Sequence, residues 1–340
     1  MTGRVLVTGA NGHVGNNLAR ALLDRGYEVR CTVRDADDPA RTTHLARHGI
    51  SDIVSLDVTD GARFCDVADG VDTLFHAAAT YRIWTGSEDA NRQMIRDSIN
   101  GATNAVRAAA DNGVRRLVLT ASVAALPFSD SPDAIVDESQ WRTDLRVPYF
   151  RAKTEAEQAA WRLAGELGVD LVTILPGVII GPGFWRRTTS TKVIENVMLG
   201  AFRTGVPNSN LPLVDIRDVV NGHIRAAETD CDGRFILCND HLPSFVEIVD
   251  LMHRIDPAVP RAWGTYPDVL LAFGPLLDRV NGWLLGSNRI LTGEYIASMR
   301  GQWWAYSNAR AKEKLGWRQD VPLETSLSDT MERIRELRSR

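Results

Sequence analysis

The sequence contains few cysteines and no large excess of positive or negative charge. Each of these features excludes certain classes of protein. Its 340 residues include four cysteines and no Cys-x-x-Cys pair, so neither a zinc site nor a disulfide framework is expected. Such cysteine usage is typical of a reduced cytoplasmic protein, and we expect no bound metal. The formal net charge is only −4, which does not favour a nucleic-acid partner or binding to an anionic membrane surface.

Long apolar runs are also missing. The nearest candidate, residues 269–277, is far shorter than the ~20 residues that span a bilayer, and it contains Gly274 and Pro275. The first residues lead directly into Val5-Leu6-Val7 and a glycine-containing turn, without the extended apolar core of a signal peptide. We therefore expect neither a membrane span nor a secretory leader.

Short apolar runs alternate with stretches of helical spacing over the first 180 residues. In the clearest helical stretch, Ile95, Ile99, Ala102, Val106 and Ala109 are separated by steps of four, three, four and three. The apolar runs, which we expect to be strands, are residues 5–8, 28–33, 53–57, 73–77, 117–120 and 171–175. Buried strands that alternate with amphipathic helices predict an α/β fold with a doubly wound parallel sheet of the Rossmann type.

The second half of the chain departs from this alternation. Residues 177–212 are rich in Gly, Thr and Pro, a strand-like run returns at 234–237, and the chain from 243 onward is helical and aromatic. We therefore predict a dinucleotide-binding domain of residues 1–176 and 211–242. A smaller substrate-binding region of residues 177–210 and 243–340 is predicted to be interleaved with it.

Residues 262–304 are predicted to form a partly helical, aromatic wall of the substrate pocket. The alternative is a packed helix without substrate contact, and the spacing alone does not separate the two. The apolar side chains that would share one face of this helix are Leu270, Phe273, Leu277, Val280 and Leu284.

A glycine-rich turn joins the first expected strand to the first expected helix, with Gly9, Gly12 and Gly15 in the spacing Gly-x-x-Gly-x-x-Gly. Without side chains the backbone can turn tightly and let a pyrophosphate approach the helix N-terminus. There the free N–H groups and the helix dipole favour an anion. In this strand–turn–helix context the pattern predicts dinucleotide binding. The residues expected to contribute are Gly9, Asn11, Gly12, His13, Val14 and Gly15.

The end of the second expected strand indicates which dinucleotide is bound. An acidic residue there would bind the ribose 2′-hydroxyl of NAD. This sequence has Arg34, whose guanidinium can clamp a 2′-phosphate, so NADP is favoured. NAD stays the less favoured alternative, because the neighbouring Asp35 could turn inward. Asp57, with Val58 beside it, follows the third expected strand. It is expected either to bind the adenine amino group or only to form a turn.

Tyr149 and Lys153 are four residues apart in an expected helix and therefore share one face. A phenol titrates at about 10 in water, and a nearby ammonium lowers its pKa toward the working range. Tyr149 is thus predicted to exchange a proton with the substrate. Lys153 is predicted to tune Tyr149 and to bind the nicotinamide ribose. Ser122 follows the strand 117–120 at the sheet edge where ligands bind, and it is predicted to hydrogen-bond the substrate oxygen. The alternative is that Ser122 only caps a helix or forms a turn.

These segments together resemble the extended short-chain dehydrogenases/reductases of the NAD-dependent epimerase/dehydratase superfamily. The similarity is to the branch with dihydroflavonol reductases, cinnamoyl-type reductases and 3β-hydroxysteroid dehydrogenases, and it rests on residues 8–15, 32–35, 119–122 and 149–153. The resemblance implies that two further segments contact the cofactor, one along the fourth strand and one whose backbone holds the nicotinamide amide. They consist of Ala77, Ala78 and Ala79, and of Pro176, Gly177, Val178 and Ile179.

The expected activity is NADP-dependent reduction of an apolar or aromatic ketone or aldehyde by hydride transfer. One alternative is an NAD-dependent nucleotide-sugar epimerase or dehydratase, which resembles this chain in its Ser-Tyr-Lys set; Arg34 speaks against it. The other is a non-catalytic NADP-sensing regulator, a class that commonly lacks the Tyr/Lys pair. The expected partner is a small-molecule carbonyl or alcohol, and a homodimer is left open.

Overall fold

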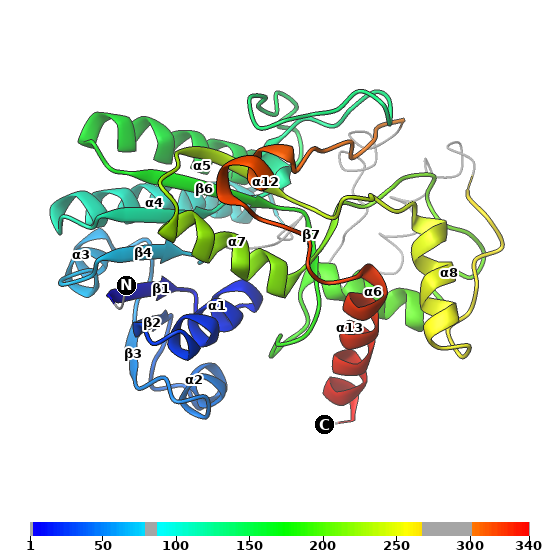
Figure 1. Ribbon diagram of the computed structural model, residues 1–340, viewed down its shortest axis with the longest axis horizontal. Coiled ribbons are helices and arrows are strands. Elements are labelled where there is room, and N and C mark those ends of the chain that lie inside the picture. Colours follow the sequence, from blue (N-terminus) through cyan, green and yellow to red (C-terminus); the bar gives the residue numbers. More distant parts are fainter. Residues whose placement is uncertain (1–2, 79–86, 267–300, 340) are drawn as a thin grey trace.

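The computed structural model describes residues 3–78, 87–266 and 301–339, and it is built on a seven-stranded, entirely parallel sheet (Figure 1). The strand order is β3-β2-β1-β4-β5-β6-β9, and neighbouring strands are in continuous register. The strands are β1 (Arg4–Thr8), β2 (Glu28–Val33), β3 (Asp52–Ser55), β4 (Thr73–His76), β5 (Arg116–Thr120), β6 (Leu171–Pro176) and β9 (Gly233–Leu237). Every strand expected from the apolar runs is present, which confirms the Rossmann-type fold.

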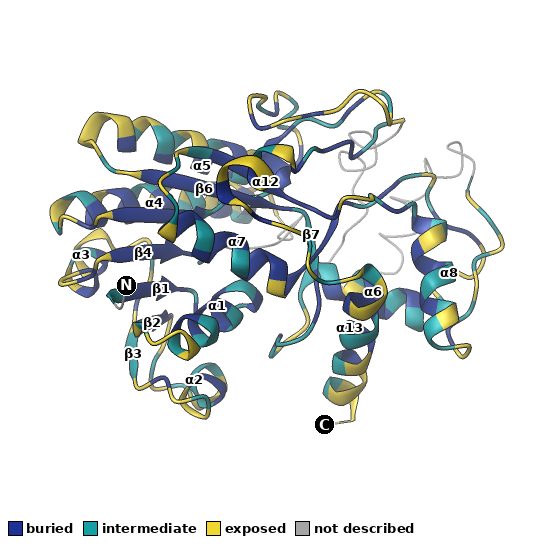
Figure 2. Ribbon diagram, viewed as in Figure 1, coloured by how far each residue is buried: buried dark blue, intermediate teal, exposed yellow. Residues whose placement is uncertain are grey.

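Helices cover both faces of the sheet, as a doubly wound fold requires. One apolar core lies between the sheet and α3 (Gly61–Val67), α4 (Glu88–Asp111) and α5 (Pro148–Leu167). The other lies between the opposite face and α1 (His13–Asp24), α2 (Pro39–Ala46) and α7 (Ile216–Glu228). Figure 2 shows the central strands of the sheet as a buried layer between these helices, whereas the edge strand β3 is only partly buried.

A third apolar core lies beside the sheet. It is formed by a short parallel pair, β7 (Val178–Ile180) and β8 (Leu213–Asp215), together with α6 (Thr189–Met198), α8 (Phe245–Ile255) and α13 (Leu323–Arg338). Helix α12 (Ala309–Leu315) and the following Trp317 instead pack into the sheet core, next to α7. The division into two interleaved parts stays a prediction. The segment of α12 and Trp317 was assigned to the substrate-binding region, yet it packs against the sheet.

The predicted aromatic wall can be followed only in part, because Leu270, Phe273, Leu277, Val280 and Leu284 lie outside the described residues. At its C-terminal end, Trp303 pairs through its backbone with Ser129, and Trp304 is buried against Phe128. In the part of the chain that the structure describes, no helix is long and apolar enough to cross a bilayer.

Candidate functional site

The glycine-rich turn has the tight geometry that the sequence pattern predicted. Gly9 has a φ of 65°, and a Cβ at Gly9 would lie 2.7 Å from the Cα of Ala78. A Cβ at Gly15 would lie 2.3 Å from the carbonyl oxygen of Gly9. Helix α1 begins directly after Gly12, which offers no side chain to cap its first N–H groups. The turn therefore forms a cradle with free backbone donors, as expected for binding a pyrophosphate.

A buried hydrogen-bond relay fixes the segment after β4 against this turn. The N–H of Ala78 donates to the hydroxyl of Thr8 at 3.2 Å, and that hydroxyl lies 3.0 Å from Nδ1 of His76. Because burial and the nearby Lys153 lower the pKa of His76 to about 3, its ring is neutral. The Thr8 hydroxyl, which accepts from Ala78, can then donate to an unprotonated Nδ1.

Of the three predicted alanines, Ala77 and Ala78 directly follow β4, and Ala78 lies against Gly9 of the glycine-rich turn. Ala79 lies outside the described residues. The roles of His76 and Thr8 were not predicted. The two residues are 68 positions apart, and nothing local in the sequence signals their contact.

His13, predicted to contact the cofactor, turns its side chain toward the loop after β7. Its Nε2 lies 2.9 Å from the carbonyl oxygen of Pro182, and its ring packs edge-on against Phe184. Burial lowers the pKa of His13 to about 4, so the neutral ring donates its Nε2–H to that carbonyl. Its side chain thus anchors this loop, and its backbone N–H remains in the first turn of α1.

Arg34 lies exposed directly after β2, and the structure shows no hydrogen bond or ion pair between its side chain and another described residue. The acidic neighbours are engaged locally. Asp35 accepts the N–H of Asp37 at 3.1 Å, and Asp38 caps α2 and pairs with Arg41 at 2.8 Å. The inward turn of Asp35 that would favour NAD is therefore absent from this arrangement.

Asp57 lies in the turn after β3, where it accepts the N–H and the hydroxyl of Thr59 at 3.0 and 2.8 Å. These hydrogen bonds, and more weakly the charge of Arg34, lower the pKa of Asp57. The carboxylate therefore forms a turn and also lies within the electrostatic reach of Arg34. The neighbouring Val58 packs toward Gly101 of α4, where an added Cβ would lie 3.0 Å from its methyl group.

Ser122, Tyr149 and Lys153 lie on two neighbouring segments, the end of β5 with η1 and the first turns of α5. Ser122 follows β5 and caps the short 3₁₀ helix η1 (Val123–Ala125), accepting the N–H of Ala124 at 3.1 Å. Tyr149, in the first turn of α5, is only 7% exposed and packs in one cluster with Ala124. Lys153 lies one turn further along α5 and close enough to His76 to affect its pKa. Burial lowers the pKa of Lys153 itself to about 8.

The segment from Pro176 to Ile179 connects the sheet to the third core. The N–H of Gly177 donates to Leu237 at 2.9 Å, and the N–H of Val178 donates to Pro212 at 2.7 Å. A Cβ at Gly177 would lie 1.9 Å from the carbonyl oxygen of Pro212, so only glycine fits. Two of the backbone donors expected to hold a nicotinamide amide are thus already used within the fold.

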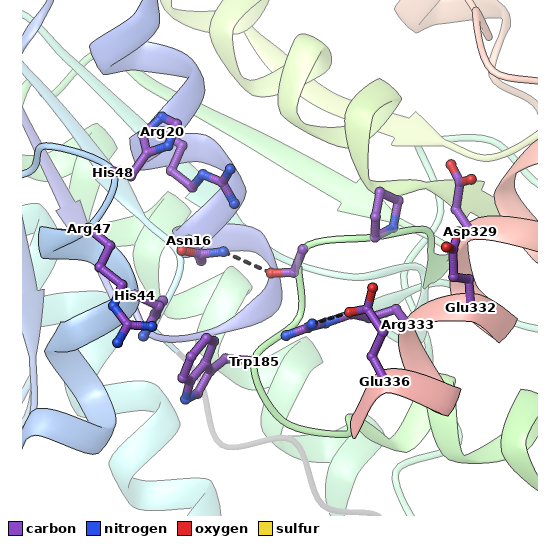
Figure 3. A pocket seen from close by; sticks show the side chains of 12 residues that line it. Asn16, Arg20, His44, Arg47, His48, Trp185, Asp329, Glu332, Arg333 and Glu336 are labelled. Atoms are coloured by element: carbon purple, nitrogen blue, oxygen red, sulfur yellow. Dashed lines mark hydrogen bonds and ion pairs between the residues drawn. The ribbon is translucent and has the colours of Figure 1, made fainter. Parts of the chain in front are cut away.

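A cavity of about 440 Å³ lies between α1, α2, the loop after β7 and α13 (Figure 3). The ring of Trp185 stacks on His44 at 4.9 Å, while Asn16 and Arg333 donate to the loop carbonyls of Gly183 and Phe184. None of the predicted site residues is among the described residues that line it. The sequence offered no signal for it, since its walls come from four separate segments.

Comparison with known proteins identifies the family. The model of the NAD-dependent epimerase/dehydratase family matches residues 5–237. Cinnamoyl-CoA reductase CAD2 of Medicago truncatula is 33% identical over 271 residues, covering 75% of this chain and 81% of that protein. Anthocyanidin reductase of Vitis vinifera is 30% identical over 286 residues, covering 77% and 84%.

Solved structures share the fold over almost the whole chain. The crystal structure of gox2253 superposes with a TM-score of 0.83 at 26% identity, covering 99% of both chains. Yeast methylglyoxal/isovaleraldehyde reductase Gre2, complexed with NADPH, gives 0.78 at 18% identity and 99% coverage of both. UDP-glucose 4-epimerase of Thermotoga maritima gives 0.73 at 18% identity, covering 98% and 99%. The chain belongs to the NAD-dependent epimerase/dehydratase family, within the extended short-chain dehydrogenases/reductases, and is an oxidoreductase with a nicotinamide cofactor.

Proposed function

We propose that the protein is an NADPH-dependent reductase that converts an apolar or aromatic ketone or aldehyde into an alcohol. The observation that carries this proposal is the meeting of three features at one sheet edge. These are the glycine cradle at Gly9 and Gly15 after β1, the exposed guanidinium of Arg34 after β2, and Ser122 after β5 with the start of α5, which carries Tyr149 and Lys153, packed against η1.

The residues around the cradle fit a dinucleotide. The backbone donors at the start of α1 would hold the pyrophosphate, Arg34 the 2′-phosphate and Lys153 the nicotinamide ribose. Asp57 and Val58 would lie beside the adenine, and Ala77, Ala78 and Ala79 along the cofactor. Pro176, Gly177, Val178 and Ile179 would lie at the nicotinamide end. When bound, the cofactor supplies a hydride for a carbonyl carbon.

The protein's own residues would manage the proton and the position of the oxygen. Ser122 orients the carbonyl oxygen through its hydroxyl, which can rotate away from the N–H of Ala124 when a substrate is present. Tyr149 gives its phenolic proton to that oxygen as the alcohol forms. The ammonium of Lys153 stabilises the phenolate that remains, because a positive charge nearby favours the ionised form.

Two observations support the aromatic or apolar substrate class. Several relatives are named as reductases of aromatic molecules, cinnamoyl-CoA and anthocyanidin among them. Beside Tyr149, aromatic rings continue from Phe150 to Phe128 at 5.7 Å and on to Trp304 at 4.6 Å. Phe150 and Trp304 are only 2% and 7% exposed, so these rings make the surroundings of the proton donor apolar, which favours an apolar substrate there.

A substrate panel read by cofactor absorbance tests the proposal. Aromatic aldehydes, ketones and thioesters are offered with NADPH or NADH, and UDP- and TDP-sugars are offered in parallel. The proposal predicts NADPH consumption with at least one carbonyl and slower turnover with NADH. Isomerisation of a nucleotide sugar without net cofactor consumption would instead identify an epimerase. NADPH binding without turnover on any substrate would identify a regulator.

A further inference from the structure

A buried ion pair continues the face of α5 that carries the proposed proton-transfer residues. Tyr149, Lys153 and Glu157 follow one another at intervals of four, so their side chains lie on successive turns of one face. Glu157 pairs with Arg234 of β9 at 2.9 Å, and the two side chains are only 1% and 8% exposed. A carboxylate thus lies in the protein interior one turn from Lys153.

The carboxylate of Glu157 accepts three hydrogen bonds, which come from Arg234 and Thr173. Its Oε1 accepts from Nε of Arg234 at 2.9 Å and from the hydroxyl of Thr173 at 2.8 Å, and its Oε2 accepts from Nη2 of Arg234 at 3.1 Å. Arg234 is itself fixed, because Nη1 donates to two loop carbonyls at 2.7 Å each and the guanidinium lies 3.6 Å from the ring centre of Trp141. These contacts therefore hold the carboxylate of Glu157 in one fixed position.

Stability alone does not explain this pair. Burying two charges costs desolvation that largely offsets their attraction, and apolar residues of similar size are often equally stable at such positions. A fixed negative charge beside Lys153, in contrast, has a chemical use. Burial lowers the pKa of Lys153, and the carboxylate of Glu157 acts in the opposite direction.

The groups on the neighbouring elements do not replace this charge. His76 of β4 is neutral, because its pKa lies at about 3, and the side chains of Ser122 before η1 and Thr173 of β6 carry no charge. The charged residues in the first half of α4 are bonded on its own surface, as Arg92 to Asp89, Arg96 to Gln93 and Gln93 to Asp97. Among the described residues, Glu157 is the anion that acts on Lys153.

We propose that Glu157 is a positioning residue for the reaction: its carboxylate, locked by Arg234 and Thr173, keeps Lys153 in the ammonium form next to Tyr149. This inference rests on the proposed function, in which the ammonium of Lys153 stabilises the phenolate of Tyr149. Both residues that lock the carboxylate come from the sheet, Thr173 from β6 and Arg234 from β9, whereas Lys153 comes from the helix.

The titration of Lys153 tests this directly and without turnover. The full-length protein is labelled with trace acetic anhydride across a pH series, and the acetylation of each lysine is read by mass spectrometry. In Glu157→Gln the labelling midpoint of Lys153 should fall by about one pH unit or more, as expected when an opposite charge is removed from its neighbourhood. The midpoint of the exposed Lys192 should not move, which provides an internal control.

Three further variants keep the test decisive. Glu157→Gln combined with Arg234→Met removes both charges, so no unpaired guanidinium is left buried, and it should lower the midpoint of Lys153 as the single variant does. Thr173→Val removes one hydrogen bond but keeps the charge, and Glu157→Asp keeps the carboxylate; both should stay closer to the parent. A parental midpoint in Glu157→Gln or in the double variant would overturn the proposal.

Turnover measurements distinguish a failure of this inference from a failure of the proposed function. On an accepted substrate, Glu157→Gln should lose more turnover at about pH 8 than at about pH 6, because Lys153 then loses its proton at lower pH. Equal losses at both pH values would assign Glu157 a purely structural role and overturn the inference. If the parent protein turned over no substrate while the labelling midpoint shifted, the proposed function would fail and the electrostatic link would stand.

Discussion

At the scale of single residues, the proposed preference for NADPH over NADH rests on the guanidinium of Arg34. In Arg34→Asp, the paired 2′-phosphate would meet a carboxylate, so the Kd for NADPH should rise by ~10–100-fold, the usual effect of losing a charge-assisted hydrogen bond. The Kd for NADH should change little. Fluorescence titration of the purified variant with both cofactors measures this.

Arg107→Asp, an equal charge change on the exposed surface of α4, is the matched control and should leave both constants unchanged. Equal affinity of the parent protein for NADPH and NADH would contradict the role given to Arg34, whatever the variant does.

Individual residues could be predicted from the sequence where the local backbone requires that residue type. Gly9 and Gly15 could be identified because a tight turn before a helix needs glycine there. The relay from Ala78 through Thr8 to His76 could not, nor could the contact between Glu157 and Arg234, 77 positions apart. Such contacts depend on which strands become neighbours, and no short pattern reports that.

At the scale of elements, the turn between β1 and α1 is the most constrained connection of the site. Gly15→Ala would place a methyl group against the carbonyl of Gly9, where 2.3 Å is available. We expect a loss of ~1–3 kcal/mol of unfolding free energy, typical of overpacking, together with weaker cofactor binding. Urea denaturation and cofactor titration measure the two effects.

Gly165→Ala is the matched substitution, because Gly165 is exposed on α5 and an added Cβ there has no atom within 4 Å. It should stabilise the protein by ~0.5–1 kcal/mol through the better helix propensity of alanine. A Gly15→Ala variant as stable as the parent would contradict the close approach of the turn to α1.

Element boundaries followed from the sequence with small shifts. The expected strand 53–57 is observed as β3, which ends at Ser55, because Asp57 leaves the strand to bond Thr59. The segment from Gly177 to Ile179 was expected to offer its backbone to the cofactor. Two of its N–H groups instead donate to Leu237 of β9 and to Pro212 in the loop before β8, a use that depends on distant segments.

At the scale of the whole molecule, the C-terminal segment of α12 and Trp317 returns to the sheet and packs into its core. Trp317 is fully buried and donates from Nε1 to the carbonyl of Asp218 at 2.8 Å. Trp317→Ala should therefore cost ~3–5 kcal/mol, as for a large aromatic ring removed from a core, and lower the Tm of the single unfolding transition. The neighbouring exposed Arg318→Ala should have almost no effect.

If Trp317→Ala instead produced a second, separate transition with the main Tm unchanged, the C-terminal segment would be an independent unit. The composition of residues 243–340 indicated a helical, aromatic region, but not that part of it completes the core of the first domain. Composition records which residues are present, and packing partners are set by the path of the chain.

The most direct test of the whole account is the turnover of Tyr149→Phe. The substitution removes the proposed proton donor and keeps the ring that packs beside Ala124 and Phe150. With NADPH and an accepted carbonyl substrate, kcat should fall by at least ~10²–10⁴-fold, the usual cost of losing a general acid. The Kd for NADPH should stay close to that of the parent, because Arg34 and the glycine turn are untouched. Turnover near the parental value would contradict the catalytic assignment.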